Sequence, residues 1–278
     1  MGLELVVSRR ATLSLRAVAL LYLTLLLLLP VGVVFWRTFE HGVGTAWSFM
    51  TTPAAVSAFW LTILLAVIAV PLNTIFGVGA AMVLVRGKAP RAGKAILDGA
   101  IDLPFVVSPV IIGLALILVY GEGGWFGDVF LHNGIRIIYA VPGMAIATVF
   151  VSLPFVVREV APVLAEVGDE QEQAAATLGA SSWQTFWRVT LPSIRWGVAY
   201  GVVLTTARAL GEIGAVLVVS SNVAGQTLTL PLLIFQRDEQ VGGQVTTSVY
   251  AAATELAVLS IVVLLLMTMF GSRTKEAR

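Results

Sequence analysis

The stretch from Asp169 to Pro192 reads DEQEQAAATLGASSWQTFWRVTLP, a polar, helix-forming segment in a chain that is otherwise mostly apolar. Asp169 is suited to cap the amino end of a short helix, and Glu172 occupies the capping-box position three residues later. Residues 171–178 favour helix, and Gly179 can end it in a left-handed conformation at little steric cost. The first half of the stretch therefore predicts a short helix followed by a glycine turn.

The second half of the stretch repeats the same signals. Ser181 with Gln184 marks the start of a second helix. Pro192 lies where that helix is expected to give way to the next apolar segment. The whole stretch predicts a helix, a glycine turn and a second helix, lying at a membrane surface.

The composition surrounding this stretch is that of a membrane protein. The 278 residues are 58% hydrophobic and 12% charged, with a mean hydropathy of +0.94, whereas soluble domains are about 25% charged. The chain has no cysteine, which excludes disulfides and thiolate metal sites. His41 and His132 are too far apart to indicate a metal site, and the net charge of +1 gives no field for nucleic acid.

Six mainly apolar segments each exceed the roughly 18 residues that a helix needs to cross a membrane. No β-barrel alternation is present, so helices are the expected spanning elements. The sequence thus predicts one all-α integral membrane domain over residues 1–278, with a long polar insert at 161–193. The expected spans are about 17–38, 56–85, 99–120, 138–160, 195–220 and 246–270.

The distribution of positive charge sets the expected orientation. Six crossings place both termini on one side, and of the 17 lysines and arginines only Arg37, Arg136 and Arg237 fall on the opposite face, with Arg208 inside a span. Cytoplasmic loops carry the excess of Lys and Arg. Both termini and the insert are therefore expected on the cytoplasmic side of a bacterial inner membrane. No cleavage site is evident after the first apolar run, so that run is expected to remain as a span.

Several residues inside the spans carry specific expectations. Gly77 and Ala81 form a pair of small residues that permits close helix approach, and Asn73 is expected to hydrogen-bond between helices. Asp98 and Asp102 are expected at the start of the third span, where negative charge is favourable. Arg158 and Glu159 are expected to mark the exit of the fourth span.

Breaks and charges inside spans indicate a pathway. Pro104 and Pro109, with Ser108 before Pro109, break the third span and leave backbone groups that protein or water must satisfy. Arg208 and Glu212 lie within the fifth span at i,i+4 and can pair along one helix face. The pair is either a structural ion pair of the bundle or part of a permeation pathway. The fifth span directly continues the polar insert, which favours the pathway.

The spacing in the insert resembles the EAA loop of ABC importer permeases. That loop has Glu-Ala-Ala, Gly, Ile and Leu-Pro in order, and this chain has Gln173 in place of Glu and Val189 in place of Ile. The resemblance implies a type I ABC importer permease fold whose coupling helix docks on a cytoplasmic ATPase. Glu172 faces about 100° away from Gln173 on a helix and does not simply replace the missing carboxylate. The coupling residues implied are Glu172, Gln173, Ala174, Ala175, Gly179, Ala180, Val189, Leu191 and Pro192.

The fifth span and the loop after it carry a second resemblance. The run RALGEIGAV at 208–216, followed by Ser220-Ser221-Asn222 and Gly225-Gln226-Thr227, is similar to the sulfate and molybdate branch of these permeases, and most to the W-type subunit of sulfate/thiosulfate importers. The pathway or gate candidates are Pro104, Ser108, Pro109, Arg208, Glu212, Ser221 and Asn222.

The resemblance also implies partners. The chain has no phosphate-binding loop of its own, so it is expected to bind no cofactor and to be no enzyme. ATP and Mg²⁺ would be used by a dimer of separate ATP-binding subunits. A second, T-type permease subunit, an external or periplasmic sulfate-binding protein and membrane lipid complete the expected partners, with no nucleic acid.

Three alternatives stay open at this point. A molybdate or tungstate permease, usually a homodimer, shares the motif of the fifth span. A secondary transporter or channel would be expected to show inverted repeats, which are not clear in this sequence. A membrane-embedded enzyme would need a polar catalytic cluster, for which Asp98 with Asp102 is the candidate, and a helix-start role explains those two residues better.

Overall fold

The computed structural model describes residues 9–240 and 246–273, and within these ranges every regular element is helical. The predicted all-α class is therefore confirmed for this part of the chain. In chain order the elements are α1 (Arg9–Leu23), η1 (Thr24–Leu28), α2 (Leu29–Phe39), α3 (Val43–Met50), α4 (Pro53–Val85), α5 (Arg91–Val106), α6 (Pro109–Tyr120), α7 (Gly127–His132), α8 (Val141–Val167), α9 (Glu170–Thr177), α10 (Ser182–Thr185), η2 (Phe186–Thr190), α11 (Leu191–Leu210), α12 (Gly214–Val219), α13 (Leu230–Gln240) and α14 (Thr247–Arg273).

The centre of the fold is a bundle of α4, α8 and α11, which share the most extensive contacts. Gly77 of α4 and Gly201 of α11 both face Val156 of α8: a Cβ added at Gly77 would lie 2.6 Å from the Val156 Cβ, and one at Gly201 would lie 2.9 Å from the Val156 Cα. Glycine is therefore required at both positions for the helices to pack this closely. Asn73 donates to Ser152 across α4 and α8 at 2.8 Å, so the predicted interhelical hydrogen bond is confirmed.

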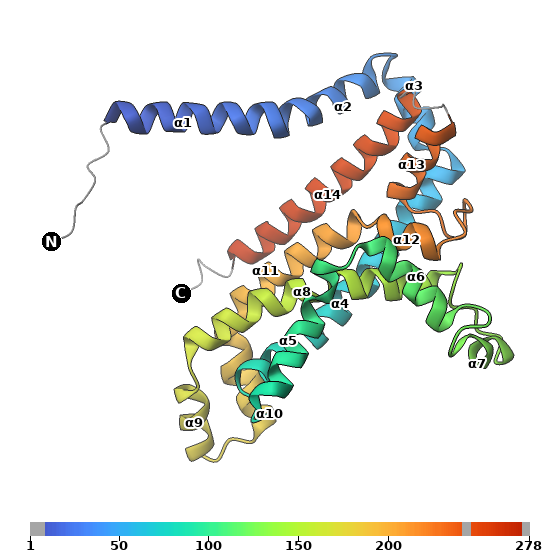
Figure 1. Ribbon diagram of the computed structural model, residues 1–278. Helices are drawn as coiled ribbons and strands as arrows, with labels where there is room; N and C mark the ends of the chain where they lie inside the picture. The colour runs from blue at the N-terminus through green and yellow to red at the C-terminus, as the bar shows by residue number, and fades with distance from the viewer. Residues whose placement is uncertain (1–8, 241–245, 274–278) are drawn as a thin grey trace.

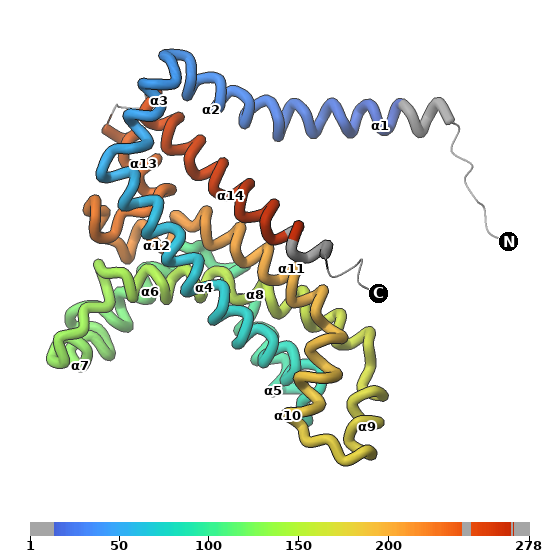
Figure 2. The backbone as a smooth tube through the Cα atoms, turned by 180° about the vertical axis from the view of Figure 1, so that it is seen from behind, coloured from blue at the N-terminus to red at the C-terminus, as the bar shows by residue number. Residues whose placement is uncertain are grey.

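The first apolar segment stands apart from this bundle. Residues Ser14–Phe39 form a helical path through α1, η1 and α2 that is long and apolar enough to cross a membrane, and none of its most apolar window is buried. Figures 1 and 2 show α1 extending away from the other helices, with only the α2 end joined to them. Its exposed leucines need a lipid or protein surface to cover them.

Four helical segments are long and apolar enough to span a membrane: Ser14–Phe39, Pro53–Val85, Val141–Val167 and Thr247–Met267. α5 and α6 become a fifth if the pair is one span, but they meet at an angle of 113°. The third span predicted at 99–120 is therefore not one helix, and the break falls directly before Pro109, one of the two prolines expected to interrupt it. Val107 is extended at the end of α5, and Ser108 is extended because the residue before a proline avoids the helical region; Pro109 then starts α6.

The predicted fifth span at 195–220 is also not one helix. α11 ends at Leu210, and the short α12 begins at Gly214 after a break. The described residues thus give four to five candidate spans rather than six. The break falls in the glycine-containing run 211–214, where the helix loses side-chain packing and backbone restriction.

The fourth span is longer than expected. α8 continues as a helix to Val167, past Arg158 and Glu159, with Pro154 and Pro162 inside it, and the helix ends at Gly168.

The expected positions of the two aspartates are wrong as well. α5 starts at Arg91, which places Asp98 and Asp102 within the helix instead of at its start. Both carboxylates pair with Arg158 of α8: Arg158 lies 2.9 Å from Asp98, and its Nε donates to Asp102 at 2.9 Å. The pairs join the two helices, and this compensates the charges better than a helix amino end would.

Different helices form the two ends of the bundle. α9 and α10 lie at one end, and α3 and α13 lie at the opposite end (Figure 1). α14 packs against α2, α3, α11 and α13, and it runs from the α3 end back towards the other one (Figures 1 and 2).

Candidate functional site

The insert forms the predicted helix and glycine turn. α9 spans Glu170–Thr177, and Gly179 follows with φ of +85°. The Gly179 N–H donates to Ala176 O, and the Ala180 N–H donates to Ala175 O, both at 3.0 Å. These two bonds satisfy carbonyls that the helix end leaves free, in the Schellman arrangement that favours glycine at the left-handed position.

The second helix of the insert starts as predicted but does not end as predicted. The Gln184 N–H donates to Ser181 Oγ at 3.3 Å, and the Ser181 N–H donates to Gln184 Oε1 at 2.9 Å, so the capping box is complete. Pro192 does not terminate the helix. The turn before it widens into the π-helix η2, where the Leu191 N–H bonds to Phe186 O. The wider turn gives the proline ring room and keeps the helical path continuous from Ser182 to Leu210.

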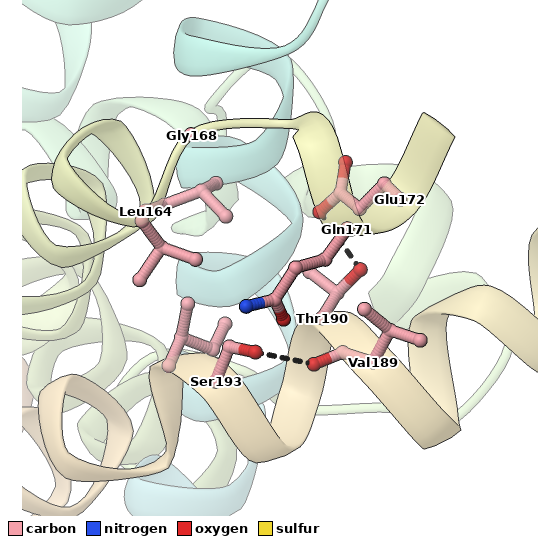
Figure 3. A pocket seen from close by; sticks show the side chains of 9 residues that line it. Leu164, Gly168, Gln171, Glu172, Val189, Thr190 and Ser193 are labelled. Atoms are coloured by element: carbon pink, nitrogen blue, oxygen red, sulfur yellow. Dashed lines mark hydrogen bonds between the residues drawn. The ribbon is translucent and has the colours of Figure 1, made fainter. Parts of the chain in front are cut away.

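The amino cap predicted for α9 is wrong. Asp169 makes no side-chain cap hydrogen bond. Glu172 does not reach back to it but turns towards the bundle, where it pairs with Arg86 at 3.2 Å and accepts from Thr190 Oγ1 at 2.9 Å. The carboxylate gains more from a guanidinium and a hydroxyl than from a single amide. Figure 3 shows the recess around Glu172, with Gln171 and Glu172 on α9 facing Val189, Thr190 and Ser193 on the neighbouring helix.

Other residues of the insert are exposed, and several of them are apolar. Gln173 points outward, one position after Glu172. Leu178 is 89% exposed, and Trp183 and Trp187 are 69% and 50% exposed, with their rings edge to face at 5.5 Å. Large apolar side chains gathered at a polar end of the bundle indicate a surface for a protein partner.

The remaining insert residues named from the sequence differ in exposure. Ala174, Gly179 and Pro192 are exposed, whereas Ala175, Ala180, Val189 and Leu191 are half-buried. Glu172 alone among them forms an ion pair with another element in the described chain.

The second group of candidates lies at the helix breaks. Arg208, on the last turn of α11, pairs with Glu212 at 2.8 Å, so the predicted contact is confirmed. Glu212 lies beyond the end of α11, and its Oε1 accepts from the Ala215 N–H of α12 at 2.9 Å. The pair therefore joins α11 to α12 across the break and does not follow one helix face. The Glu212 side chain is 2% exposed, and that of Arg208 is 32% exposed.

The bend between α5 and α6 lies beside this break. A Cβ on Gly214 would lie 2.9 Å from the Pro109 Cβ, and one on Gly113 would lie 2.7 Å from the Val218 Cβ. Pro104 is buried in α5, whereas Ser108 is exposed at the bend. Pro109 and the Arg208–Glu212 region are thus brought together by packing of α6 against α12.

Ser221 and Asn222 occupy the turn that follows α12. Ser221 shares a hydrogen bond of 2.6 Å with the Thr227 hydroxyl, and the Asn222 N–H donates to Ser220 Oγ at 2.9 Å. Asn222 has φ of +55°, a conformation that asparagine tolerates better than most residues. These hydrogen bonds stay within residues 220–227 and do not reach Arg208.

Two arginines important to the arrangement were not foreseen as partners. Arg86 was not singled out in the sequence, and Arg158 was expected only to mark the exit of a span. The one feature of the sequence that sets Arg86 apart is its position directly after the long apolar run that forms α4. Its partner Glu172 lies 86 residues further along the chain. No local spacing in the sequence indicates such a contact.

The described residues form an all-helical bundle with long apolar segments, two neighbouring helix breaks and a capped insert at one end, which is the architecture of a membrane permease. A family model described as the binding-protein-dependent transport system inner membrane component matches residues 9–276, and the chain belongs to this family. The resemblance seen in the sequence is therefore confirmed.

The chain is also similar to individual permease proteins. The chain is 51% identical over 258 residues to the sulfate transport system permease protein CysW of Synechocystis sp., covering 93% of this chain and 92% of that one. It is 37% identical over 256 residues to the sulfate transport system permease protein CysT, also of Synechocystis sp., covering 92% of this chain and 89% of that one. A solved bacterial alginate ABC transporter, in complex with an alginate pentasaccharide-bound periplasmic protein, has a chain with a TM-score of 0.75 at 16% identity, covering 96% of both chains. That likeness supports the type I permease fold.

Proposed function

We propose that this chain is a permease subunit of an ATP-driven importer that carries sulfate or thiosulfate across the bacterial inner membrane. The observation that carries the proposal is the continuous helical path from the exposed insert at Ser182 to Arg208 at the break of α11. A displacement of the insert can move Arg208 with it as one rigid helix. The names of the relatives that align over most of this chain support sulfate as the cargo.

The chain would act as one domain with six crossings. The bent pair α5 and α6 supplies one crossing, and α11 with α12 supplies another, in addition to the four long apolar segments. Both termini and the insert would then lie in the cytoplasm, as the distribution of Lys and Arg requires. The terminal residues 1–8 and 274–278, including Lys275 and Arg278, lie outside the described residues.

The partners that the family implies would meet different surfaces of the chain. A dimer of ATP-binding subunits, using ATP and Mg²⁺, would dock on the surface formed by Leu178, Trp183 and Trp187. A second, T-type permease subunit and lipid would cover the exposed first apolar segment. An external sulfate-binding protein would deliver the anion, in line with the periplasmic protein in the alginate transporter complex. This chain itself would perform no catalysis.

The pathway would pass the helix breaks. Glu212 neutralises Arg208, so the guanidinium does not hold an anion tightly. A polar lining that attracts an anion briefly and releases it suits transport better than a tight site. Pro109, packed beside the break, and Ser108, exposed at the bend, would complete the lining.

Uptake of radiolabelled sulfate in cells lacking this chain tests the proposal. Sulfate uptake should fall and be restored by the wild-type chain, with molybdate uptake unchanged. Loss of molybdate uptake alone would instead identify a molybdate or tungstate permease. Sulfate uptake that needs no ATP-binding partner would identify a secondary transporter or channel.

A further inference from the structure

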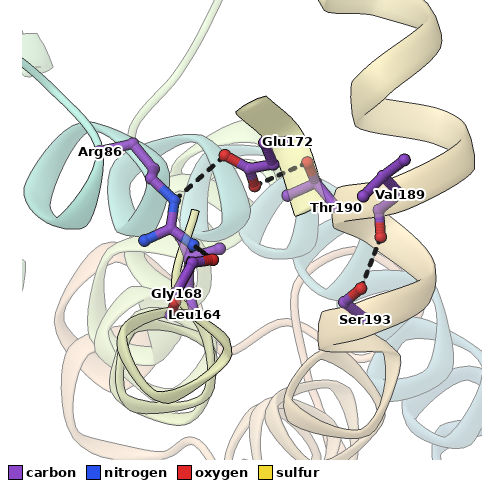
Figure 4. Close-up of polar contacts among 7 residues, drawn as sticks. All are labelled: Arg86, Leu164, Gly168, Glu172, Val189, Thr190 and Ser193. Atoms are coloured by element: carbon purple, nitrogen blue, oxygen red, sulfur yellow. Dashed lines mark hydrogen bonds and ion pairs between the residues drawn. The ribbon is translucent and has the colours of Figure 1, made fainter. Parts of the chain in front are cut away.

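Arg86 forms a junction of four helical elements. It is the residue directly after α4, and its Nη2 donates to Leu164 O at 3.0 Å and also to Gly168 O. Its Nε donates to Glu172 Oε2 at 3.2 Å, and the other carboxylate oxygen of Glu172 accepts from Thr190 Oγ1 at 2.9 Å. Figure 4 shows these contacts converging between α4, the end of α8, α9 and η2.

The chemistry of the junction favours a rigid link. The last carbonyls of a helix have no intrahelical partners, and the Arg86 fork satisfies one near the end of α8 and one just beyond it. The side chains of Arg86 and Glu172 are only 19% and 22% exposed, so water screens their pairing less than it screens a surface pair. A guanidinium that meets a carboxylate and two carbonyls is also fixed in orientation.

α9 depends on this junction for its position. None of its residues is buried, so it has little apolar packing of its own. Within the described chain, Glu172 is the α9 side chain whose hydrogen bonds reach other elements, since the bond of Thr177 returns to Ala174. The three helices it reaches through Arg86 and Thr190 are α4, α8 and the path into α11, which form the centre of the bundle.

We propose that Arg86 and Glu172 form a clamp that holds α9 to the bundle and transmits its displacement to α4, α8 and α11. Both are positioning residues and contact neither the anion nor ATP. The transmission part rests on the proposed function, because it assumes that an ATP-binding partner moves α9. The clamp part rests on the contacts of this chain alone.

A spin label tests the clamp without any partner or substrate. The chain has no cysteine, so Thr177→Cys gives a single labelling site at the end of α9. In the purified full-length chain, Glu172→Ala should raise the rotational mobility of the label by at least about twofold, because α9 loses its anchor. Arg86→Ala should do the same. The matched control is Glu170→Ala, which removes an exposed carboxylate from the first turn of the same helix and should leave the mobility unchanged.

Transmission is tested in the assembled transporter, by the number of ATP molecules hydrolysed per anion taken up into proteoliposomes. Glu172→Ala should raise this ratio at least severalfold while the ATP-binding subunits stay bound. The variant Arg86→Ala with Glu172→Ala should be no worse than either single change, since both act through one link. Glu170→Ala should again behave as wild type.

Each contrary result has a distinct meaning. Unchanged label mobility in Glu172→Ala overturns the clamp, whatever the chain transports. Raised mobility with an unchanged ratio of ATP to anion overturns transmission. Loss of the ATP-binding subunits in Glu172→Ala, without a change in mobility, shows that Glu172 contacts the partner directly and also overturns the proposal. A wild-type complex that hydrolyses ATP without taking up sulfate contradicts the proposed function, and the label then decides the clamp separately.

Discussion

Removing the charges of Arg208 and Glu212 one at a time should have unequal effects. Arg208→Ala leaves the Glu212 carboxylate in a site where its side chain is 2% exposed, and removing one partner of a buried pair costs about 3–5 kcal/mol. Glu212→Ala leaves the Ala215 N–H without its acceptor, and an unsatisfied buried donor costs about 1–3 kcal/mol. The remaining Arg208 is about one-third exposed and can turn towards water if the pathway is wet.

The expected gap of about 2 kcal/mol corresponds to roughly thirtyfold in the unfolding equilibrium. It can be measured by titrating the purified chain with denaturing detergent. The double change Arg208→Ala with Glu212→Ala removes both charges and should recover stability relative to Arg208→Ala alone. Glu212→Gln keeps an oxygen for the Ala215 N–H and should cost less than Glu212→Ala.

The same variants report on transport. If Arg208 serves the pathway, the double variant should fold and assemble but take up little sulfate per assembled transporter. Equal destabilisation by Arg208→Ala and Glu212→Ala would show that the exposed part of Arg208 faces lipid or protein rather than a wet pathway. Normal yield together with normal uptake in Arg208→Ala would refute both the structural and the pathway role.

The other predictions concern the insert and the orientation. Gly179→Val forces a β-branched residue into φ of +85° and should cost about 1–2 kcal/mol at the turn, lowering uptake and transport-linked ATP hydrolysis without loss of membrane insertion. Gly44→Val, where no atom lies within 4 Å of the added Cβ and φ is not positive, is the control; equal uptake in the two variants would contradict the coupling role of the turn. Gln173→Glu should keep assembly with the ATP-binding subunits, and loss of the complex on co-purification would show that the insert docks differently. A single cysteine at Ser181 should react with impermeant reagent only from the cytoplasm and one at Gly225 only from outside; the reverse pattern would overturn the proposed orientation.

Sequence alone determined the features that depend on near neighbours in the chain. The apolar runs determined the helical membrane class, because backbone groups in lipid must be satisfied within a helix. The turn at Gly179 and the capping box of Ser181 with Gln184 were predicted correctly, since each of their hydrogen bonds joins residues three to five positions apart. The family could also be identified from motif spacing alone.

Tertiary structure decided where charges and breaks find their partners. Glu172 could equally serve a local cap or a distant arginine, and only the approach of α4 to α9 brings Arg86 within reach. Asp98 and Asp102 likewise pair with Arg158, 56 residues beyond Asp102.

The positions of the helix breaks also depend on tertiary contacts. Proline is tolerated inside α8 at Pro154 and Pro162, yet α5 and α6 bend by 113° before Pro109. The residue type is the same in all these places, so the outcome depends on the surroundings. A proline is accommodated where neighbouring helices or a widened turn satisfy the freed carbonyl, and the helix breaks where packing against another element, here α12 against α6, stabilises the bent path.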